Sequence, residues 1–432
     1  MTVDILSVTG STGGGDIRKG SSVNLRTSDR TGRRSTGTRS RGRLALAAVF
    51  VGTLVLTGCT IGDSGSGDGQ VAEAPAGPAA VIDVSVADGA LDANPAEPVV
   101  LTAENGRLDS VVMRNPEGVQ VQGEFNPEFT EWRTTEDLGY GRQYTLESAA
   151  TDEAGLVTRS NATFSTITPN IMTAAYLTVG EGEVVGIGQP VAIMFDEPIA
   201  DRRAAQENIH ITTTPEVEGA FYWVSNQEVR WRPAEYWEPG TEVDVHVDIY
   251  GEDLGGGMYG QQDNQAAFEI GDAVVSRVDD ANKQIVIERN GEVVKTMPTS
   301  MGKASTPTPN GTYVIGEKHA SMILDSSTYG VSVDSAEGYR TPVQYATRMS
   351  YSGIFIHAAP WSVWAQGSQN TSHGCLNVTT SDAKWFYDNA KRGDIFEVTG
   401  TVGGTLPGWD GLGDWNVPWE TWKAGNADQG AA

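Results

Sequence analysis

Short apolar runs separated by turn-forming residues make up most of the chain from about residue 81 onward. The runs are rich in Val, Thr and Tyr, and the breaks between them are rich in Gly, Asn, Asp and Pro. This spacing is typical of antiparallel strands in a sandwich, where alternate side chains face the core. The pattern therefore predicts a mainly β protein.

An internal repeat divides the first part of this β-rich region. Residues 121–125 (VQGEF) are echoed by residues 217–221 (VEGAF), and a Trp-Arg pair follows each segment, at Trp132 and at Trp231. The two Trp residues are 99 positions apart, close to the length of one immunoglobulin-like domain. We therefore predict two tandem immunoglobulin-like β-sandwiches, over residues 81–168 and 169–271.

The repeated Trp132 and Trp231 lie inside strand-like runs. A Trp in such a pattern belongs to a hydrophobic core more often than to a sugar-binding surface. We predict that both side chains are buried and that the sandwiches act as spacers, with carbohydrate binding as the alternative.

A different pattern begins near Ala273. Residues 273–278 (AVVSRV) resemble a strand, and Asn290-Gly291 between two apolar runs is a strong hairpin signal. One helix is expected over about residues 381–392, with Ser381 as its N-cap and Gly393 after its end. We predict a third, β-rich domain with a short helix over residues 272–399.

The C-terminal extension, residues 400–432, has a high aromatic content. It contains Trp409, Trp415, Trp419 and Trp422. A free tail would not need so many large apolar side chains, so we predict that the extension packs against the third domain. A sugar-binding strip is the alternative.

The N-terminal region has the layout of an export signal. An Arg-rich segment precedes fifteen apolar residues, 44–58, and the run stops at Cys59. Because a membrane-spanning helix needs roughly 20 apolar residues, a signal is favoured over a permanent span. Residues 56–59 (LTGC) resemble a bacterial lipobox, which predicts a signal over residues 1–58, a lipid on Cys59, and a flexible linker over residues 59–80. A free, buried Cys59 is the alternative.

The charge of the chain excludes one class of partner. The formal net charge is -26, and residues 1–58 contribute nine Lys and Arg against three Asp and Glu, so the remainder carries -32. Phosphate backbones repel so acidic a protein, and we expect no nucleic-acid partner.

The candidate chemistry centres on the second of the two cysteines, Cys375. Residues 353–357 (GIFIH) resemble a strand ending in His357. Seventeen residues separate His357 from Cys375, which lies in the segment 372–377 (SHGCLN). A thiol attacks acyl groups as the thiolate, so Cys375 needs an imidazole to take its proton. Both His357 and His373 are available, and we favour His357 because a neighbour in the same tight turn often points elsewhere.

The turn that contains Gly374 adds a second chemical element. Gly374 would allow backbone N–H groups of Gly374 and Cys375 to approach a reacting carbonyl and stabilise its oxyanion. Two other interpretations compete. His357, His373 and Cys375 could bind zinc, although no CxxC or well-spaced fourth ligand is present. Alternatively, Cys375 is an inert buried thiol.

These residues resemble the L,D-transpeptidases of the YkuD fold, whose signature is an upstream His, a loop and Ser-His-Gly-Cys. The segments HAAPWSVWAQGSQNTSHGCLN, KWFYDNAKRGD and GTLPGWDGLGDWNVPW are similar to the actinobacterial, mycobacterial-type enzymes, which carry two immunoglobulin-like domains before the catalytic one. The resemblance implies a mainly β chain with two tandem sandwiches, a YkuD-type catalytic domain with a short helix, and a C-terminal extension.

The resemblance also implies a reaction and residue roles. The nucleophile attacks meso-diaminopimelate in a tetrapeptide stem, expels D-Ala, and transfers the acyl group to an amine of a neighbouring stem. No cofactor or metal is implied. By position, Cys375 is the nucleophile and His357 the base, and the residues that shape the site or contact substrate are His373, Gly374, Asn377, Tyr329, Tyr339, Ser352 and Gly353.

Two positions depart from the family pattern. Ala358 follows the catalytic His where Ser is common, but the backbone carbonyl is what orients the imidazole, so we expect little effect. Leu324 replaces a pocket Met, a swap that nearly conserves volume.

Two other functions remain open beside cross-linking. Water could resolve the thioester, which gives L,D-carboxypeptidase action, or the chain could be a non-catalytic wall-binding lipoprotein. NlpC/P60 peptidases fit less well, because their catalytic His follows the Cys. Sortases fit less well because they need a downstream catalytic Arg, and Arg392 lies at the expected helix end. We expect stem peptides as partners, carbapenem β-lactams as covalent inhibitors, and an extracytoplasmic location, lipid-anchored to the outer face of the plasma membrane and reaching into the wall.

Overall fold

The computed structural model describes residues 77–429 of the chain. The predicted signal over residues 1–58, the lipobox with Cys59 and most of the linker lie outside the described residues. Ala80, at the end of the predicted linker, is already buried in the first core, with 3% of its surface exposed. Within residues 77–429, no helix is both long and apolar enough to span a membrane.

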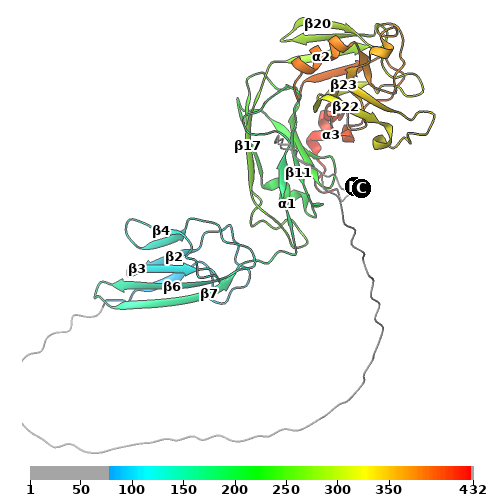
Figure 1. Ribbon diagram of the computed structural model, residues 1–432. Coiled ribbons are helices and arrows are strands. Elements are labelled where there is room, and N and C mark those ends of the chain that lie inside the picture. Colours follow the sequence, from blue (N-terminus) through cyan, green and yellow to red (C-terminus); the bar gives the residue numbers. More distant parts are fainter. Residues whose placement is uncertain (1–76, 430–432) are drawn as a thin grey trace, which may run out of the picture. The chain divides into compact units, whose positions relative to one another are not determined.

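The first sandwich consists of two antiparallel sheets (Figure 1). One has the strand order β1 (Val81–Val84), β2 (Val100–Glu104), β5 (Glu131–Thr134), β4 (Gly123–Phe125), and the other contains β3 (Gly106–Arg114), β6 (Gln143–Asp152) and β7 (Val157–Ser165). Alternate residues of these strands face inward, and Leu101, Trp132 and Leu146 are among those that form the core.

The second sandwich is built from two four-stranded sheets. The first has the order β13 (Gly219–Trp223), β14 (Glu228–Pro233), β11 (Val191–Phe195), β9 (Ala175–Leu177), and the second has the order β10 (Val184–Val185), β17 (Asn264–Ile270), β15 (Glu242–Val247), β12 (Ile209–Thr214). A short pair, β8 (Ile171–Thr173) and β16 (Met258–Gly260), and helix α1 (Arg202–Glu207) complete it.

The sequence repeat has the same structural meaning in both sandwiches. Phe125 pairs with Trp132 between β4 and β5, and Phe221 pairs with Trp231 between β13 and β14. A Cβ added to Gly123 would lie 2.1 Å from the Trp132 ring, and one added to Gly219 would lie 2.1 Å from the Trp231 ring. Both Trp side chains are buried, which confirms that they are core residues.

The third domain packs two sheets around one core. The larger sheet has the order β20 (Glu292–Pro298), β19 (Gln284–Arg289), β18 (Val274–Asp279), β26 (Ile395–Thr399), β21 (Gly311–Val314). The smaller has the order β22 (Lys318–Asp325), β23 (Arg340–Arg348), β24 (Phe355–Ala358), β25 (Leu376–Val378). The predicted hairpin at Asn290-Gly291 is confirmed between β19 and β20, with both residues at positive φ, 51° and 83°.

Helix α2 (Thr380–Asn389) is the predicted helix, but its boundaries differ from those expected. Thr379, and not Ser381, is the N-cap, because its side chain accepts the hydrogen bond from the Asp382 N–H at 3.1 Å. The helix also ends earlier, at Asn389, and Lys391 lies in the turn that leads to β26. Figure 1 shows α2 near β23, against which it packs.

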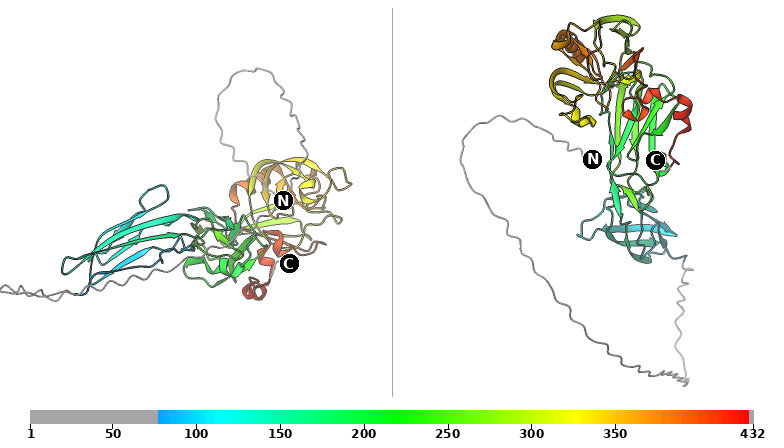
Figure 2. Two further views of the ribbon diagram at one scale, coloured as in Figure 1. Left: turned by 90° about the horizontal axis from the view of Figure 1, so that it is seen from below. Right: turned by 90° about the vertical axis from the view of Figure 1, so that its right-hand side faces the viewer.

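The C-terminal extension divides its contacts between two domains, which corrects the prediction. Its segments η3 (Gly408–Asp410), η4 (Asp414–Asn416) and α3 (Trp419–Ala424) follow Leu406, which is part of the core of the third domain. Trp422, however, is fully buried against the second sandwich, where its Nε1–H donates to Ala220 O at 2.8 Å. Figure 2 shows this red segment beside the green strands.

A buried cation explains why the extension favours the second sandwich. Arg232 of β14 lies over the rings of Trp415 and Trp422, each 4.4 Å away, and over the Trp419 ring at 5.6 Å. These rings cover an Arg that is only 1% exposed. Trp409 takes no part and is 75% exposed.

Candidate active site

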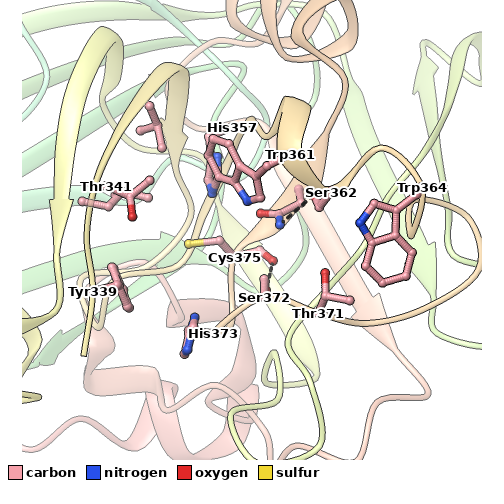
Figure 3. Close-up of a pocket in the computed structure, with 13 residues that line it drawn as sticks. Tyr339, Thr341, His357, Trp361, Ser362, Trp364, Thr371, Ser372, His373 and Cys375 are labelled. Atoms are coloured by element: carbon pink, nitrogen blue, oxygen red, sulfur yellow. Dashed lines mark hydrogen bonds between the residues drawn. The ribbon is translucent and has the colours of Figure 1, made fainter. Parts of the chain in front are cut away.

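A cavity of about 460 Å³ opens beside the smaller sheet of the third domain (Figure 3). Its lining mixes aromatic, aliphatic and polar side chains with one thiol and two imidazoles. The lining residues are Leu324, Tyr339, Thr341, Val343, His357, Trp361, Ser362, Trp364, Thr371, Ser372, His373, Cys375 and Asn377.

Strand pairing brings His357 and Cys375 into this cavity. β24 and β25 are parallel neighbours, with His357 opposite Asn377 and Ile356 opposite Leu376. Because side chains alternate along a strand, Cys375, Asn377 and His357 face the same side of the sheet. The seventeen intervening residues, which include the 3-10 turn η2 (Pro360–Ser362), allow this return in the parallel sense.

The imidazole of His357 is buried and oriented by the backbone. The side chain is 3% exposed, and its Nδ1–H donates to the carbonyl oxygen of Ala358 at 3.0 Å. That contact leaves Nε2 as the basic nitrogen. The prediction that a backbone carbonyl, and not the side chain of residue 358, orients the ring is confirmed.

Burial keeps both reacting groups neutral. It raises the pKa of the Cys375 thiol to about 11, against a smaller lowering by the Phe355 backbone N–H. It also lowers the pKa of His357, although the hydrogen bond to Ala358 opposes this. At pH 7 the pair is therefore a thiol and a neutral imidazole, and the imidazole can accept a proton.

The Cys375 thiol points into the cavity. Cys375 Sγ donates to the Gly353 carbonyl at 3.5 Å. Figure 3 shows the sulfur in the space framed by His357, Thr341 and Tyr339.

Ser372 holds the turn that carries the nucleophile. Its hydroxyl donates to Cys375 O at 2.6 Å and accepts from the Gly374 N–H at 3.1 Å. Gly374 has φ 129°, and a Cβ there would lie 2.7 Å from Ile354, so the turn requires glycine. Two backbone N–H groups were expected to bind the oxyanion. The Gly374 N–H already donates to Ser372 Oγ, so the Cys375 N–H is the donor that can bind the oxyanion in this geometry.

His373 faces the mouth of the cavity and not the thiol. Its Nε2 lies 3.2 Å from Glu337 Oε2 and 3.3 Å from Lys303 Nζ. Its ring also packs against Tyr339, with 5.2 Å between the ring centroids. The sequence offered two imidazoles as the base. The structure places His357 in the cavity beside the nucleophile, whereas His373 contacts Glu337 and Lys303.

The other predicted residues take different places. Tyr339 and Asn377 line the cavity, as does Leu324. Asn377 Nδ2 donates to Ser362 Oγ at 3.1 Å, so it links β25 to η2. Tyr339, beside the thiol, has its pKa raised to about 12 by burial and by the Cys375 charge.

Three predicted site residues, Tyr329, Ser352 and Gly353, lie near the cavity but do not line it. The Gly353 carbonyl touches the thiol, and a Cβ on Gly353 would lie 2.8 Å from the Tyr329 ring. Tyr329, at the end of η1 (Ser326–Tyr329), therefore packs over Gly353, just before β24. Ser352 is exposed and outside the lining, because its N–H donates to Asp410 Oδ2 at 3.0 Å and its hydroxyl contacts Ser350.

Sequence reasoning missed the two Trp side chains of the loop between β24 and β25. Trp361 and Trp364 line the cavity yet remain 52% and 68% exposed. The signal that could have identified them is the presence of two large aromatic residues in a loop without strand periodicity, where no core requires them. Within residues 77–429, no three His, Cys, Asp or Glu side chains are arranged to hold a metal ion.

Comparisons with known proteins agree with this geometry. A family model described as the L,D-transpeptidase catalytic domain matches residues 273–399, and one described as a bacterial Ig domain matches residues 90–253. L,D-transpeptidase 2 of Mycobacterium tuberculosis (strain CDC 1551) is 53% identical over 89% of this chain and 97% of that protein.

Two further relatives are less similar. L,D-transpeptidase 5 of Mycobacterium tuberculosis (strain H37Rv) is 34% identical over 91% of this chain and 86% of that protein. The solved structure of an L,D-transpeptidase in complex with imipenem is 38% identical, covers 52% of this chain and 97% of its own, and has a TM-score of 0.46.

Proposed function

This chain belongs to the L,D-transpeptidase family, and on that premise we propose that it cross-links peptidoglycan stems through a thioester on Cys375. The observation that carries the proposal is the neutral His357 imidazole, fixed by Ala358 O on the strand next to Cys375. A neutral base beside a neutral thiol suits proton transfer during attack.

The acylation step uses both residues in turn. The Cys375 thiol gives its proton to His357 Nε2 as its sulfur bonds to the meso-diaminopimelate carbonyl. The tetrahedral oxyanion accepts a hydrogen bond from the Cys375 backbone N–H. When the carbon–nitrogen bond to D-Ala breaks, the His357 imidazolium returns the proton to the departing amine, which leaves a thioester.

The second step repeats this sequence in reverse order. A side-chain amine of a neighbouring stem attacks the thioester, His357 takes a proton from that amine, and the sulfur leaves and regains the proton. The product is an amide between two diaminopimelate residues. Trp361 and Trp364 line the open side of the cavity, where the acceptor stem would approach the thioester.

Mass spectrometry tests this proposal. The full-length protein, incubated with a tetrapeptide stem and an amine acceptor stem, is expected to release D-Ala and form the cross-linked dimer. Cys375→Ala is expected to form neither product. Release of D-Ala with tripeptide as the sole other product would contradict cross-linking and indicate hydrolysis.

The same nucleophile is expected to react with carbapenems. Attack of the Cys375 sulfur on the strained lactam carbonyl opens the ring and leaves an acyl adduct, with the proton passing to the ring nitrogen through His357. Intact-mass measurement is expected to give one adduct on the wild-type protein and none on Cys375→Ala. An equal adduct on both would place the reaction elsewhere.

We also propose a lipid anchor at Cys59 that holds the enzyme outside the plasma membrane and within reach of the wall. The apolar run at 44–58 and the LTGC segment support it. Cells expressing Cys59→Ala are expected to lose fatty-acid labelling of the protein and to release it from the membrane fraction. Retained labelling would contradict the anchor.

A further inference from the structure

Three charged or basic side chains meet beside the mouth of the cavity. Lys303 Nζ lies 2.7 Å from Glu337 Oε2, and His373 Nε2 lies 3.2 Å from the same oxygen. The second carboxylate oxygen of Glu337 accepts a hydrogen bond from Ser305 at 3.4 Å. One carboxylate is therefore surrounded by an ammonium, an imidazole and a hydroxyl.

The lining of the cavity has no permanent cation. Its thirteen residues include no Arg or Lys, but the His373 side chain contacts the Lys303 ammonium at 3.3 Å. A donor stem, however, brings a carboxylate on its terminal D-Ala and another on the diaminopimelate side chain. A bound carboxylate gains most from a charge-assisted partner close to the mouth.

The two sides of this cluster belong to different parts of the domain. The Lys303 backbone N–H donates to Ser372 O at 3.0 Å, so Lys303 is tied to the same turn as His373 and Cys375. Glu337 lies in residues 330–339, between η1 and β23, where most side chains are exposed. Glu337 can therefore withdraw without displacing the nucleophile.

We propose that Lys303 and His373 form a binding site for a carboxylate of the donor stem, and that Glu337 occupies this site in the free chain. This inference rests on the proposed function, because it needs a stem peptide as substrate. Lys303 and its hydrogen bond also lower the pKa of Glu337, so Glu337 is an ionised stand-in for the substrate carboxylate at pH 7.

Binding measurements on the full-length Cys375→Ala protein test the site, because this variant binds the donor without consuming it. Three tetrapeptides serve as probes: the free acid, the D-Ala carboxamide, and the form amidated on the diaminopimelate side chain. Lys303→Met is expected to weaken binding of the free acid about tenfold, the scale of one charge-assisted hydrogen bond.

The two amides identify which carboxylate binds. If Lys303→Met costs less than twofold for the D-Ala carboxamide, the terminal carboxylate is the ligand. If the loss disappears only for the side-chain amide, the diaminopimelate carboxylate is the ligand. Equal losses for all three peptides, or no loss for any, overturn the carboxylate site.

Glu337→Gln separates occupation of the site from a structural role. Removing the competing carboxylate is expected to tighten binding of the free acid about threefold, since the ligand no longer displaces an ion-paired group. Unchanged or weaker binding overturns the stand-in role.

Arg340→Gln is the matched control for Lys303→Met, because it removes a nearby cation that pairs with Asp325. A loss equal to that of Lys303→Met would indicate a general charge effect and overturn the site.

Turnover distinguishes failure of this inference from failure of the proposed function. If the wild-type protein releases D-Ala from the free acid but Lys303→Met shows no peptide-dependent loss, only the carboxylate site fails. If the wild-type protein neither binds nor processes the free acid, both fail. Unchanged thermal stability of each variant confirms that the fold is intact.

Discussion

At the scale of single residues, the nucleophile and the base are held neutral by burial. Many cysteine enzymes instead keep a thiolate–imidazolium pair, which needs a thiol pKa below that of the imidazole. Here the pKa of Cys375 is raised to about 11 and that of His357 is lowered. Reactivity is therefore expected to depend on proton transfer that accompanies attack on the substrate.

This neutrality predicts the pH dependence of alkylation at Cys375. Since the thiol loses its proton only near pH 11, the thiolate fraction rises about tenfold per pH unit below that value. The rate of iodoacetamide reaction in a Cys59→Ser background should therefore climb about tenfold per unit between pH 7 and 10. A plateau beginning below pH 8 would indicate a resting ion pair. Intact mass against time gives the rate.

Ser372 is expected to control the geometry of the nucleophile. Ser372→Ala removes both hydrogen bonds that hold the turn, to Cys375 O and from the Gly374 N–H. Acylation by a carbapenem should slow about ten- to hundredfold, because small misplacements of a reacting group have effects of this size. Ser368→Ala, which loses a hydroxyl contact to Ala365 O in the same loop, should react like wild type. Equal rates for both variants would contradict a role for Ser372.

At the scale of elements, the two sandwiches depend on close contact between a strand Gly and a Trp ring. The contact lets Trp132 and Trp231 fill the space against the neighbouring strand, which a side chain on Gly123 or Gly219 would block. The same Gly–Trp contact occurs in both halves of the repeat. It explains why a Trp follows each of the two VxGxF segments.

Gly219→Ala is accordingly expected to destabilise the second sandwich. Its Cβ would lie 2.1 Å from the Trp231 ring, so the ring or the strand must shift, at a cost of about 2 kcal/mol for overpacking. Gly404→Ala, where nothing lies within 4 Å of the added Cβ, should change the free energy of unfolding by less than about 0.5 kcal/mol. Urea unfolding measures both. A Gly219→Ala value as small as the control would show that the sheet relaxes freely.

At the scale of the whole described chain, a buried ion pair joins the second sandwich to the C-terminal extension. Arg230 of β14 contacts Asp414 of η4 at 2.7 Å, and the Asp414 side chain is 0% exposed. Arg230 also donates to Gly411 O at 2.6 Å. Glu228 also accepts from the Arg230 guanidinium, at 2.6 Å, so two carboxylates share this buried cation.

A double-mutant cycle tests how much this pair contributes. Arg230→Met leaves the Asp414 carboxylate buried without its partner, which should cost about 3–5 kcal/mol. Replacing both, with Arg230→Met and Asp414→Leu, should recover at least half of that loss. The measurement is urea unfolding of the four proteins. Additive losses would mean that the two side chains do not interact across the interface.

Features that depend on local pattern could be predicted from the amino-acid sequence. Alternation and turn residues predicted a mainly β chain, and Asn290-Gly291 predicted the hairpin, because only residues that tolerate positive φ form so tight a turn. The Trp132 and Trp231 repeat predicted core positions. The Ser-His-Gly-Cys segment indicated the nucleophile, since its chemistry is contained in contiguous residues.

Features that depend on partners far apart in the sequence required the folded chain. The sequence favoured His357 over His373 but could not show the contacts that separate them. Parallel pairing of β24 and β25 places His357 on the nucleophile's side, and His373 contacts Glu337 and Lys303 at the mouth. The Trp residues of the extension pack on the second sandwich because Arg232, far away in sequence, offers a cation that their rings can cover. Such contacts leave no periodic trace in the chain, because each partner lies on a separate element and meets the other only after folding.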